Sequence, residues 1–356
     1  MPGYGIVSGV ALKETASARV FEKLVQDILH VNGKGVDESY INGSALGSQS
    51  IAIPHVKLGA GDFRKLGASV NGGQFNANGT VISDADYFYV PLLYVYDRTE
   101  TLAKIMNDKA GYDLLGAKTD NIRKKIARGI NALTFATQIA QTLNESATSG
   151  KALYFTESTG TKLYDHYIDA NAALDEGDEA IGADYFPTEQ RQAFFRPSAF
   201  AQMKKDKGVI LESNLGQEML ATGVLNPFKN SEASKVEMRD GYCGEIDGVG
   251  CYKVSPIILA LAATYCQKEG SALANTAFDK IDAMVCSAVG TIRGFTSTSE
   301  IEVVPAQSGQ GWVLQPLVHG GCVCISGKSV RLIVASGFTN PAEETKQLSV
   351  LPTESH

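Results

Sequence analysis

One stretch of the chain, residues 59–80, reads GAGDFRKLGASVNGGQFNANGT and is rich in glycine and asparagine. It holds few large apolar side chains, so it is too polar to form a core and too long for an ordinary connection. The flanking residues 51–58 and 86–97 are rich in β-branched and aromatic residues, which predicts two antiparallel strands. Together these segments predict a long hairpin arm. Since such an arm cannot bury its own faces, we expect another copy of the chain to cover them.

Residues 15–30 (TASARVFEKLVQDILH) have the apolar periodicity of an α-helix. Their apolar side chains fall on one stripe, which consists of Val20, Phe21, Leu24, Val25, Ile28 and Leu29. This apolar face needs a partner, and the predicted helix ends at Asn32-Gly33.

A longer helix is predicted over residues 115–143, where apolar residues recur every three or four positions. Ile122, Ile126 and Ile130 mark the face that we expect to be buried. At 1.5 Å per residue such a helix spans about 40 Å, so we interpret it as a spine for the molecule.

Composition excludes several classes of protein. The chain has 356 residues, 44% of them hydrophobic, and a net charge of −7, so it can bury a large core. Its only dense basic cluster is Arg123, Lys124, Lys125 and Arg128, which we interpret as a solvated helix face rather than a nucleic-acid stripe. The longest apolar run, residues 254–265, is too short to cross a bilayer and is expected in the core. The N-terminus lacks the pattern of a signal peptide, which favours a cytoplasmic location.

The cysteines lie in the last third of the chain, at positions 243, 251, 266, 286, 322 and 324. A zinc site using His319 with two cysteine pairs is one interpretation, but the Cys-Val-Cys spacing of a strand differs from a metal-binding knuckle. The other interpretation is that the cysteines are reduced thiols buried in strands. In residues 241–256 (GYCGEIDGVGCYKVSP), a two-residue turn at Asp247-Gly248 would pair Cys243 with Tyr252. Only a three-residue loop would permit a disulfide between Cys243 and Cys251.

Catalytic motifs are absent from the sequence: there is no GxSxG, HExxH, GxxxxGK[ST] or strand-linked GxGxxG pattern. The acidic group Asp175, Glu176, Asp178 and Glu179 lacks the spacing of a calcium loop, so a solvated acidic face is favoured over a cation site. We therefore predict no enzymatic activity and no cofactor.

The order of elements resembles that of the major capsid proteins of tailed bacteriophages, which have the Hong-Kong-97-type fold. A glycine-rich arm and a spine helix are followed by FFRPSAFAQMKKD, similar to the family's strand that ends in a Pro-Ser turn before a helix. We expect that helix to begin at Ser198, whose hydroxyl would cap it. Then comes GEIDGVGCYKV, similar to the family's glycine-containing hairpin.

The resemblance implies an α+β fold with an N-terminal arm (1–50), an extended loop (51–97), a peripheral domain with the spine (98–150), an axial domain with returning peripheral strands (151–335) and a C-terminal tail (336–356). It implies a virion component, assembled in the host cytoplasm without a membrane, that forms the pentamers and hexamers of an icosahedral shell. The shell would enclose double-stranded DNA without sequence-specific binding, with a portal and possibly separate scaffold or decoration proteins as partners. The candidate inter-subunit contacts are loop residues Asp62, Phe63, Arg64, Lys65, Gln74, Phe75 and Asn76.

Two departures from the family and two alternatives accompany this interpretation. The arm-like sequence starts almost at Met1, which implies a separate scaffold protein or none. In the family, a loop lysine can form a covalent crosslink with an asparagine of another subunit. Lys57 and Lys65 lie on or near the loop, but nothing in the sequence identifies the asparagine, so we do not predict this crosslink.

One alternative is an encapsulin, which shares the fold and encloses protein cargo. The other is an enzyme that uses the cysteines and histidines of the last third.

Overall fold

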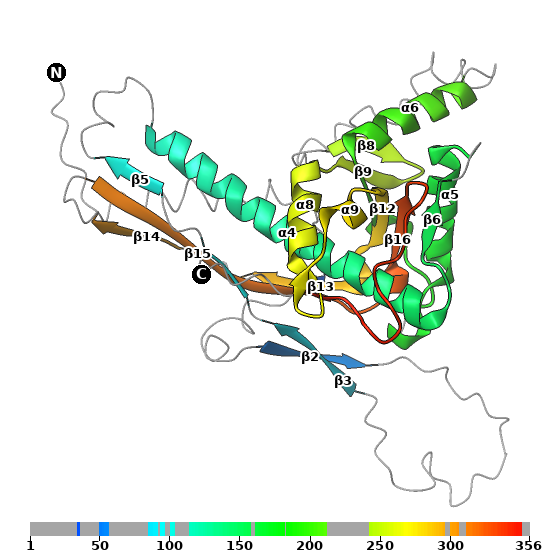
Figure 1. Cartoon of the computed structure of the whole chain (residues 1–356), viewed down its shortest axis with the longest axis horizontal. Helices are drawn as coiled ribbons and strands as arrows, with labels where there is room; N and C mark the ends of the chain where they lie inside the picture. Colours follow the sequence, from blue (N-terminus) through cyan, green and yellow to red (C-terminus); the bar gives the residue numbers. More distant parts are fainter. Residues whose placement is uncertain are drawn as a thin grey trace, which may run out of the picture.

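In the computed structural model the spine helix connects a compact part of the molecule with an elongated part (Figure 1). The structure describes the strand segments 34–35, 50–56, 85–91, 93–96 and 100–103, and then residues 114–157, 161–181, 183–211, 242–295, 300–305 and 311–350. Within these residues helices and sheets are both prominent, which confirms the expected α+β class.

The spine is α4 (Leu114–Ser149), a single helix of 36 residues, longer at its C-terminal end than the sequence predicted. Its length is about 54 Å at 1.5 Å per residue. The predicted face is buried: Ile122, Ile126 and Ile130 are 0%, 1% and 1% exposed. The buried threonines do not disturb the helix, because Thr134, Thr137 and Thr142 donate their hydroxyls to the carbonyl four residues earlier. The helix ends at Ser149, and the next residue, Gly150, has a φ of +67°, which suits glycine.

The compact part is built on a six-stranded sheet. In spatial order it runs β6 (Tyr154–Thr156), β16 (Val330–Val334), β12 (Ile281–Ser287), β7 (Arg191–Phe195), β9 (Val249–Lys253) and β8 (Tyr242–Ile246). The β6–β16 and β7–β9 pairs are parallel and the other pairs are antiparallel. Strands β7 and β16 are buried at every position, as expected for central strands covered on both faces, and this includes the polar side chains of Arg191, Gln192 and Arg331.

Helices cover both faces of this sheet. On one face α4 and α8 (Pro256–Tyr265) pack over Phe194, Met284 and Leu332. On the other, α5 (Leu163–Ala173) and α6 (Pro197–Leu211) pack over alternate residues of the same strands, such as Phe195 and Ile333. The period-2 alternation of a strand therefore separates the two cores of a helix–sheet–helix sandwich.

The elongated part is organised by β15 (Gly311–Cys324), a strand of 14 residues that runs from the far end of the elongated part to the compact part (Figure 1). It pairs antiparallel with β13 (Thr291–Phe295), β14 (Glu300–Pro305), β4 (Leu93–Tyr96) and β5 (Glu100–Ala103). The short strand β1 (Lys34–Gly35) lies parallel to β13, with Lys34 opposite Ile292. One long strand thus joins segments from both ends of the sequence.

The strands of the arm pair as predicted over most of their length. β2 (Ser50–Val56) and β3 (Ala85–Pro91) form an antiparallel two-stranded sheet, with Ser50 opposite Pro91 and Val56 opposite Ala85. The prediction of one continuous strand over 86–97 was wrong at its C-terminal end. Residues 93–96 leave the arm and join β15 as β4, so the arm is anchored directly to the long strand.

The hairpin β8–β9 has the predicted two-residue turn, with Asp247 and Gly248 at positive φ and Ile246 opposite Val249. The predicted pairing of Cys243 with Tyr252 was wrong, because the register shifts at Cys243 and brings Tyr242 opposite Tyr252. A bulge of this kind adds one residue to one strand, and turn length alone does not predict it.

Two further boundaries differ from the predictions. Helix α6 begins at Pro197 rather than at Ser198, so the serine lies inside the first turn and not at the cap. Proline is suited to this first position because its missing N–H has no helical partner there. The apolar run 254–265 forms α8, and only one of its faces is buried, by Ile258, Leu259, Ala262 and Ala263. Within the described residues, no helix is long and apolar enough to span a membrane.

Residues 336–350, which the sequence presents as part of a polar tail, pack along the spine. The Asn144 side chain donates to the Leu348 carbonyl at 2.9 Å and accepts from the Leu348 amide at 2.7 Å. Asn340 donates to the Leu143 carbonyl at 3.0 Å, and Ala342 and Leu348 are buried. Two amide side chains therefore hold this segment against the C-terminal half of α4.

Candidate functional site

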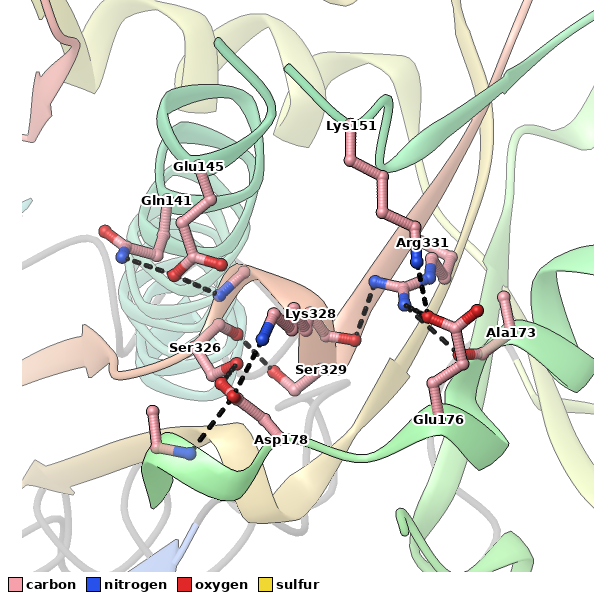
Figure 2. Close-up of polar contacts among 12 residues, drawn as sticks. Gln141, Glu145, Lys151, Ala173, Glu176, Asp178, Ser326, Lys328, Ser329 and Arg331 are labelled. Carbon is pink, nitrogen blue, oxygen red and sulfur yellow. Dashed lines mark hydrogen bonds and ion pairs between the residues drawn. The ribbon is translucent and has the colours of Figure 1, made fainter. Parts of the chain in front are cut away.

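A cluster of polar contacts lies where the C-terminal end of α4 meets the turn between β15 and β16. We call it the spine junction and define it by Glu145, Asp178, Ser326, Gly327, Lys328 and Arg331 (Figure 2). These residues come from the spine, from the segment after α5 and from the two strands that link the parts of the molecule, so the junction ties the spine to the compact part.

The turn, which contains the short helix η8 (Gly327–Ser329), rests directly on the spine backbone. The Gly327 amide donates to Glu145 Oε1 at 2.8 Å, and Gln141 Nε2 donates to the same oxygen at 2.9 Å. A Cβ at Gly327 would lie 2.9 Å from the Gln141 carbonyl oxygen and 2.9 Å from Thr142 Cα. Only glycine therefore permits this approach of the turn to the helix.

Asp178 holds the other side of the turn. Its carboxylate accepts hydrogen bonds from Ser326 Oγ at 2.6 Å, from Lys328 Nζ at 3.0 Å and from the Ala180 amide at 3.3 Å. The side chain is 7% exposed. Burial acts to raise the pKa of Asp178, but the hydrogen bonds from Ser326 and Lys328 and the charge of Lys328 outweigh it, and the pKa is lowered. The carboxylate is therefore ionised and fully engaged.

Arg331 forms the third element of the junction, although it lies in a buried strand. Its guanidinium, 3% exposed, donates to the Lys328 carbonyl at 2.8 Å and to the Ala173 carbonyl at 3.1 Å. Glu176 lies 3.9 Å from it and accepts a hydrogen bond from Lys151 Nζ at 2.6 Å. That hydrogen bond, with the charge of Lys151, lowers the pKa of Glu176. Arg331 thus binds the carbonyl end of α5 to the turn.

A cavity of about 370 Å³ opens beside these contacts. Its lining combines the end of the spine with the junction and consists of Glu145, Thr148, Ser149, Lys151, Leu153, Asp178, Ala180, Ile325, Lys328 and Arg331. The carboxylates and cations in this lining are all engaged, with one another, with the backbone or, for Lys151, with Glu176 outside the lining, and no histidine or cysteine lies among the lining residues. The arrangement supports a mechanical role, in which the junction fixes the angle between the spine and the compact part.

The sequence interpretation of the acidic group as a solvated face holds for Asp175, Glu176 and Glu179, which are exposed, and was wrong for Asp178. Asp178 is buried in the junction, Glu176 is paired with Lys151, and Asp175 is paired with the buried Arg191. One signal in the sequence could have indicated these contacts: Arg191 and Arg331 lie in short segments with large apolar residues, RQAFF and VRLIV, where a buried charge requires an internal partner.

All six cysteines are free thiols, and five of them are buried in strands, as predicted; Cys243 is half-buried. Burial raises the pKa of Cys266 and of Cys324 to about 12. Within the part of the chain that the structure describes, no group of histidine, cysteine and acidic residues is arranged to hold a metal ion. The structure therefore offers no support for the zinc interpretation.

The predicted inter-subunit contacts lie outside the described residues. Asp62, Phe63, Arg64, Lys65, Gln74, Phe75 and Asn76 all fall between β2 and β3. The paired strands that carry this loop are described, and their attachment through β4 to β15 places its base on the elongated part. The contacts themselves stay a prediction.

No protein-family model and no curated protein sequence matches this chain. Solved structures are similar to it. The capsid structure of the cyanophage P-SCSP1u matches with a TM-score of 0.51 and 12% identity, over 90% of this chain and 89% of that one. The mature capsid of bacteriophage PhiM1 has a TM-score of 0.47 and 9% identity, over 82% and 83%. The capsid of Ralstonia phage GP4 has a TM-score of 0.47 and 12% identity, over 80% and 82%.

The match to the cyanophage capsid extends over nearly the full length of both chains. At this level of identity the likeness concerns the fold. The matched 90% of the chain is more than either the compact part or the elongated part contains, so the match includes residues of both parts. The protein therefore has the Hong-Kong-97-type fold of tailed-phage capsid subunits, as the resemblance in its sequence implied.

Proposed function

We propose that this protein is the major capsid protein of a tailed phage and that it self-assembles into an icosahedral shell around double-stranded DNA. The observation that carries the proposal is the match of 90% of the chain to a phage capsid structure. An enzyme gains nothing from a two-stranded arm that is anchored through β4 to the middle of a long strand. A shell subunit gains a second point of contact with its neighbours.

The physical basis is that many weak contacts repeated by symmetry hold a closed shell. In this proposal residues 1–50 act as an arm and 51–97 as an extended loop. Residues 98–150 belong to a peripheral domain, 151–335 to an axial domain with returning strands, and 336–356 to a C-terminal segment. The loop residues 62–65 and 74–76 contact adjacent copies, which form pentamers and hexamers. A rigid spine junction suits this role, because an error in the angle between the two parts would be repeated in every subunit.

The net charge of −7 fits a container for nucleic acid. A shell with an acidic balance repels packaged DNA, so it encloses the genome without binding its sequence. The proposal places the protein in the virion after assembly in the host cytoplasm. A portal complex occupies one vertex, with scaffold or decoration proteins as further partners.

Electron microscopy of the expressed full-length chain tests the proposal. We expect closed shells of uniform diameter, and only monomers or small oligomers at high concentration would contradict it. The contents of particles from infected cells distinguish a capsid from an encapsulin: DNA protected from nuclease supports the capsid, and a protein cargo contradicts it.

Deleting residues 59–80 tests the role of the loop. The deletion should leave folded, soluble subunits that fail to assemble, because the β2–β3 strands and the rest of the fold are retained. Normal shells from this variant would refute the contact assigned to the loop, while the electron microscopy result for the complete chain would stand.

A further inference from the structure

The N-terminal half of α4 has the opposite sign of charge from the rest of the chain. Residues 114–131 carry five basic side chains and one acidic one, a net charge of +4. Since the whole chain carries −7, all the other residues together carry −11. The charged members of this segment are Lys118, Asp120, Arg123, Lys124, Lys125 and Arg128.

The helix places part of this charge on its exposed side. Lys124 and Arg128 are exposed and each stands two positions from Ile126, about 200° round the helix, so they lie opposite the buried face. Lys125 is exposed on the same side. We call Lys124, Lys125 and Arg128 the basic stripe. It lies on the half of α4 that projects beyond the compact part (Figure 1), and it ends where positions 129–140 are all buried.

The exposure of these cations agrees with the solvated face that the sequence predicted, but solvation does not explain their single sign. Several cations of the compact part have carboxylate partners: Lys151, Lys268, Lys328 and Lys346 each lie within 3.0 Å of a carboxylate oxygen. Neither Lys124 nor Arg128 forms an ion pair with a described residue.

The spacing of the stripe gives it a cost that an anionic partner removes. Lys124 and Arg128 are four positions apart on α4, where two like charges repel each other and destabilise the helix. A helix face that serves only for solubility normally mixes both signs of charge. The stripe is therefore suited to a partner with closely spaced negative charges.

Double-stranded DNA has this distribution of charge. Residues 118–128 extend about 15 Å along the helix, and B-DNA carries about nine phosphates over that length. Contacts from lysine and arginine to phosphates do not depend on the base sequence. The stripe can therefore bind any duplex that lies against it.

The charge of the remaining residues favours one side of the subunit for this contact. Helix α4 lies against β15, β4 and β5, so its buried side faces that sheet and the stripe points away from it. A surface with a net charge of −11 repels DNA, whereas the stripe attracts it. In a shell around DNA, the electrostatic energy is lower when the stripe is on the inner side.

We propose that the basic stripe of α4 faces the interior of the shell and binds the phosphate backbone of the enclosed DNA. The inference rests on the proposed function, because it requires a shell that contains DNA. It adds the orientation of the subunit, with α4 on the inner side of the elongated part and the β15 sheet on the outer side. A few attractive contacts in each subunit would position the outer layer of DNA, while the acidic remainder keeps the genome from adhering.

Lysine acetylation in particles from infected cells tests the proposal. Lys124 should react at least about fivefold more slowly in DNA-filled particles than in particles that have released their DNA, because phosphates surround its amine. Lys162 and Lys205, exposed lysines of the compact part, are the matched controls and should react equally in both. Equal rates at Lys124 would overturn the proposal, whether both are fast, as in a solvated face, or both are slow, as under a neighbouring copy.

Binding of a short fluorescent duplex to unassembled subunits gives a second test. Lys124→Gln/Arg128→Gln removes two charges from the stripe, and Lys162→Gln/Lys205→Gln removes two from the compact part. In the first variant the slope of log affinity against log salt should fall by about 1.8, at about 0.9 per phosphate contact, and in the second it should stay at the wild-type value. Equal slopes in the two variants would overturn the proposal.

The outcomes for the stripe and for the shell are separate. Shells that contain DNA but leave Lys124 unprotected would refute the stripe contact and leave the proposed function intact. A chain that forms no shells under the electron microscope would refute the proposed function itself.

Discussion

Substituting Gly327 by alanine should open the spine junction without altering the rest of the fold. The added Cβ would lie 2.9 Å from the Gln141 carbonyl oxygen, from Thr142 Cα and from Glu145 Oε2. The Glu145 side chain can move, but the other two atoms belong to the helix backbone, so the turn must be displaced. Overpacking of this kind costs about 1–3 kcal/mol. Displacement also weakens the hydrogen bond from the Gly327 amide to the Glu145 carboxylate, and bonds to charged groups contribute roughly 1.5–3 kcal/mol.

Because the two effects share one displacement, we expect a combined loss of about 2–4 kcal/mol rather than their full sum. Hydrogen exchange measured by mass spectrometry reports this loss locally. Peptides from the end of β15 through β16 and from the C-terminal half of α4 should exchange faster by a factor of roughly 30 to 1,000, at about 1.4 kcal/mol per tenfold change. Peptides from α5 and α6 should change far less.

A second variant separates the two causes. Glu145→Gln keeps the shape of the side chain and removes only its charge, so it should accelerate exchange by a smaller factor than Gly327→Ala. If Gly327→Ala leaves exchange in β15, β16 and α4 unchanged, the turn does not rest on the spine as described. If it accelerates exchange equally throughout the compact part, the junction is not a local contact.

Three further predictions concern the core and its ionisable groups. Ile126→Asp should lower the free energy of unfolding by several kcal/mol, because an unpaired charge would occupy a site that is 1% exposed; an unchanged melting temperature would refute the placement of this face. Since the pKa of Asp178 is lower in the folded protein than its ordinary value of 3.8, this group stabilises the fold above that value, and its contribution is lost as the pH falls through the folded pKa. Acid unfolding of the wild type should therefore lose this contribution below about pH 4, a dependence that Asp178→Asn should lack, and identical pH dependence in the two proteins would contradict the assignment. Cys266 and Cys324, whose pKa values are raised to about 12 by burial, should resist iodoacetamide at about pH 8 in the native protein and react after unfolding; rapid labelling of either thiol in the native state would contradict its burial.

Local patterns in the sequence were sufficient where one element determines its own structure. The period of Ile122, Ile126 and Ile130 predicted both the spine and its buried face, since an isolated helix already places these residues on one side. The Asp247-Gly248 turn was predictable because two positive φ angles require residues of this kind. The order of such elements along the chain was also enough to indicate the capsid fold.

Contacts between distant segments were decided only by the tertiary structure. The acidic group 175–179 looked like a solvated face, and nothing local shows that Ser326 and Lys328, about 150 residues later, come to Asp178. The predicted strand 86–97 is divided, because its C-terminal half pairs with β15 and its N-terminal half pairs with β2. Cys243 lies at a bulge in β8, and the pairing with β9 determines where this bulge occurs. The sequence by itself determined which faces are apolar and where turns can form, because these follow from side chains a few positions apart. Only the folded chain decided which buried charges meet and which strand edges pair, because these depend on the arrangement of all the elements together.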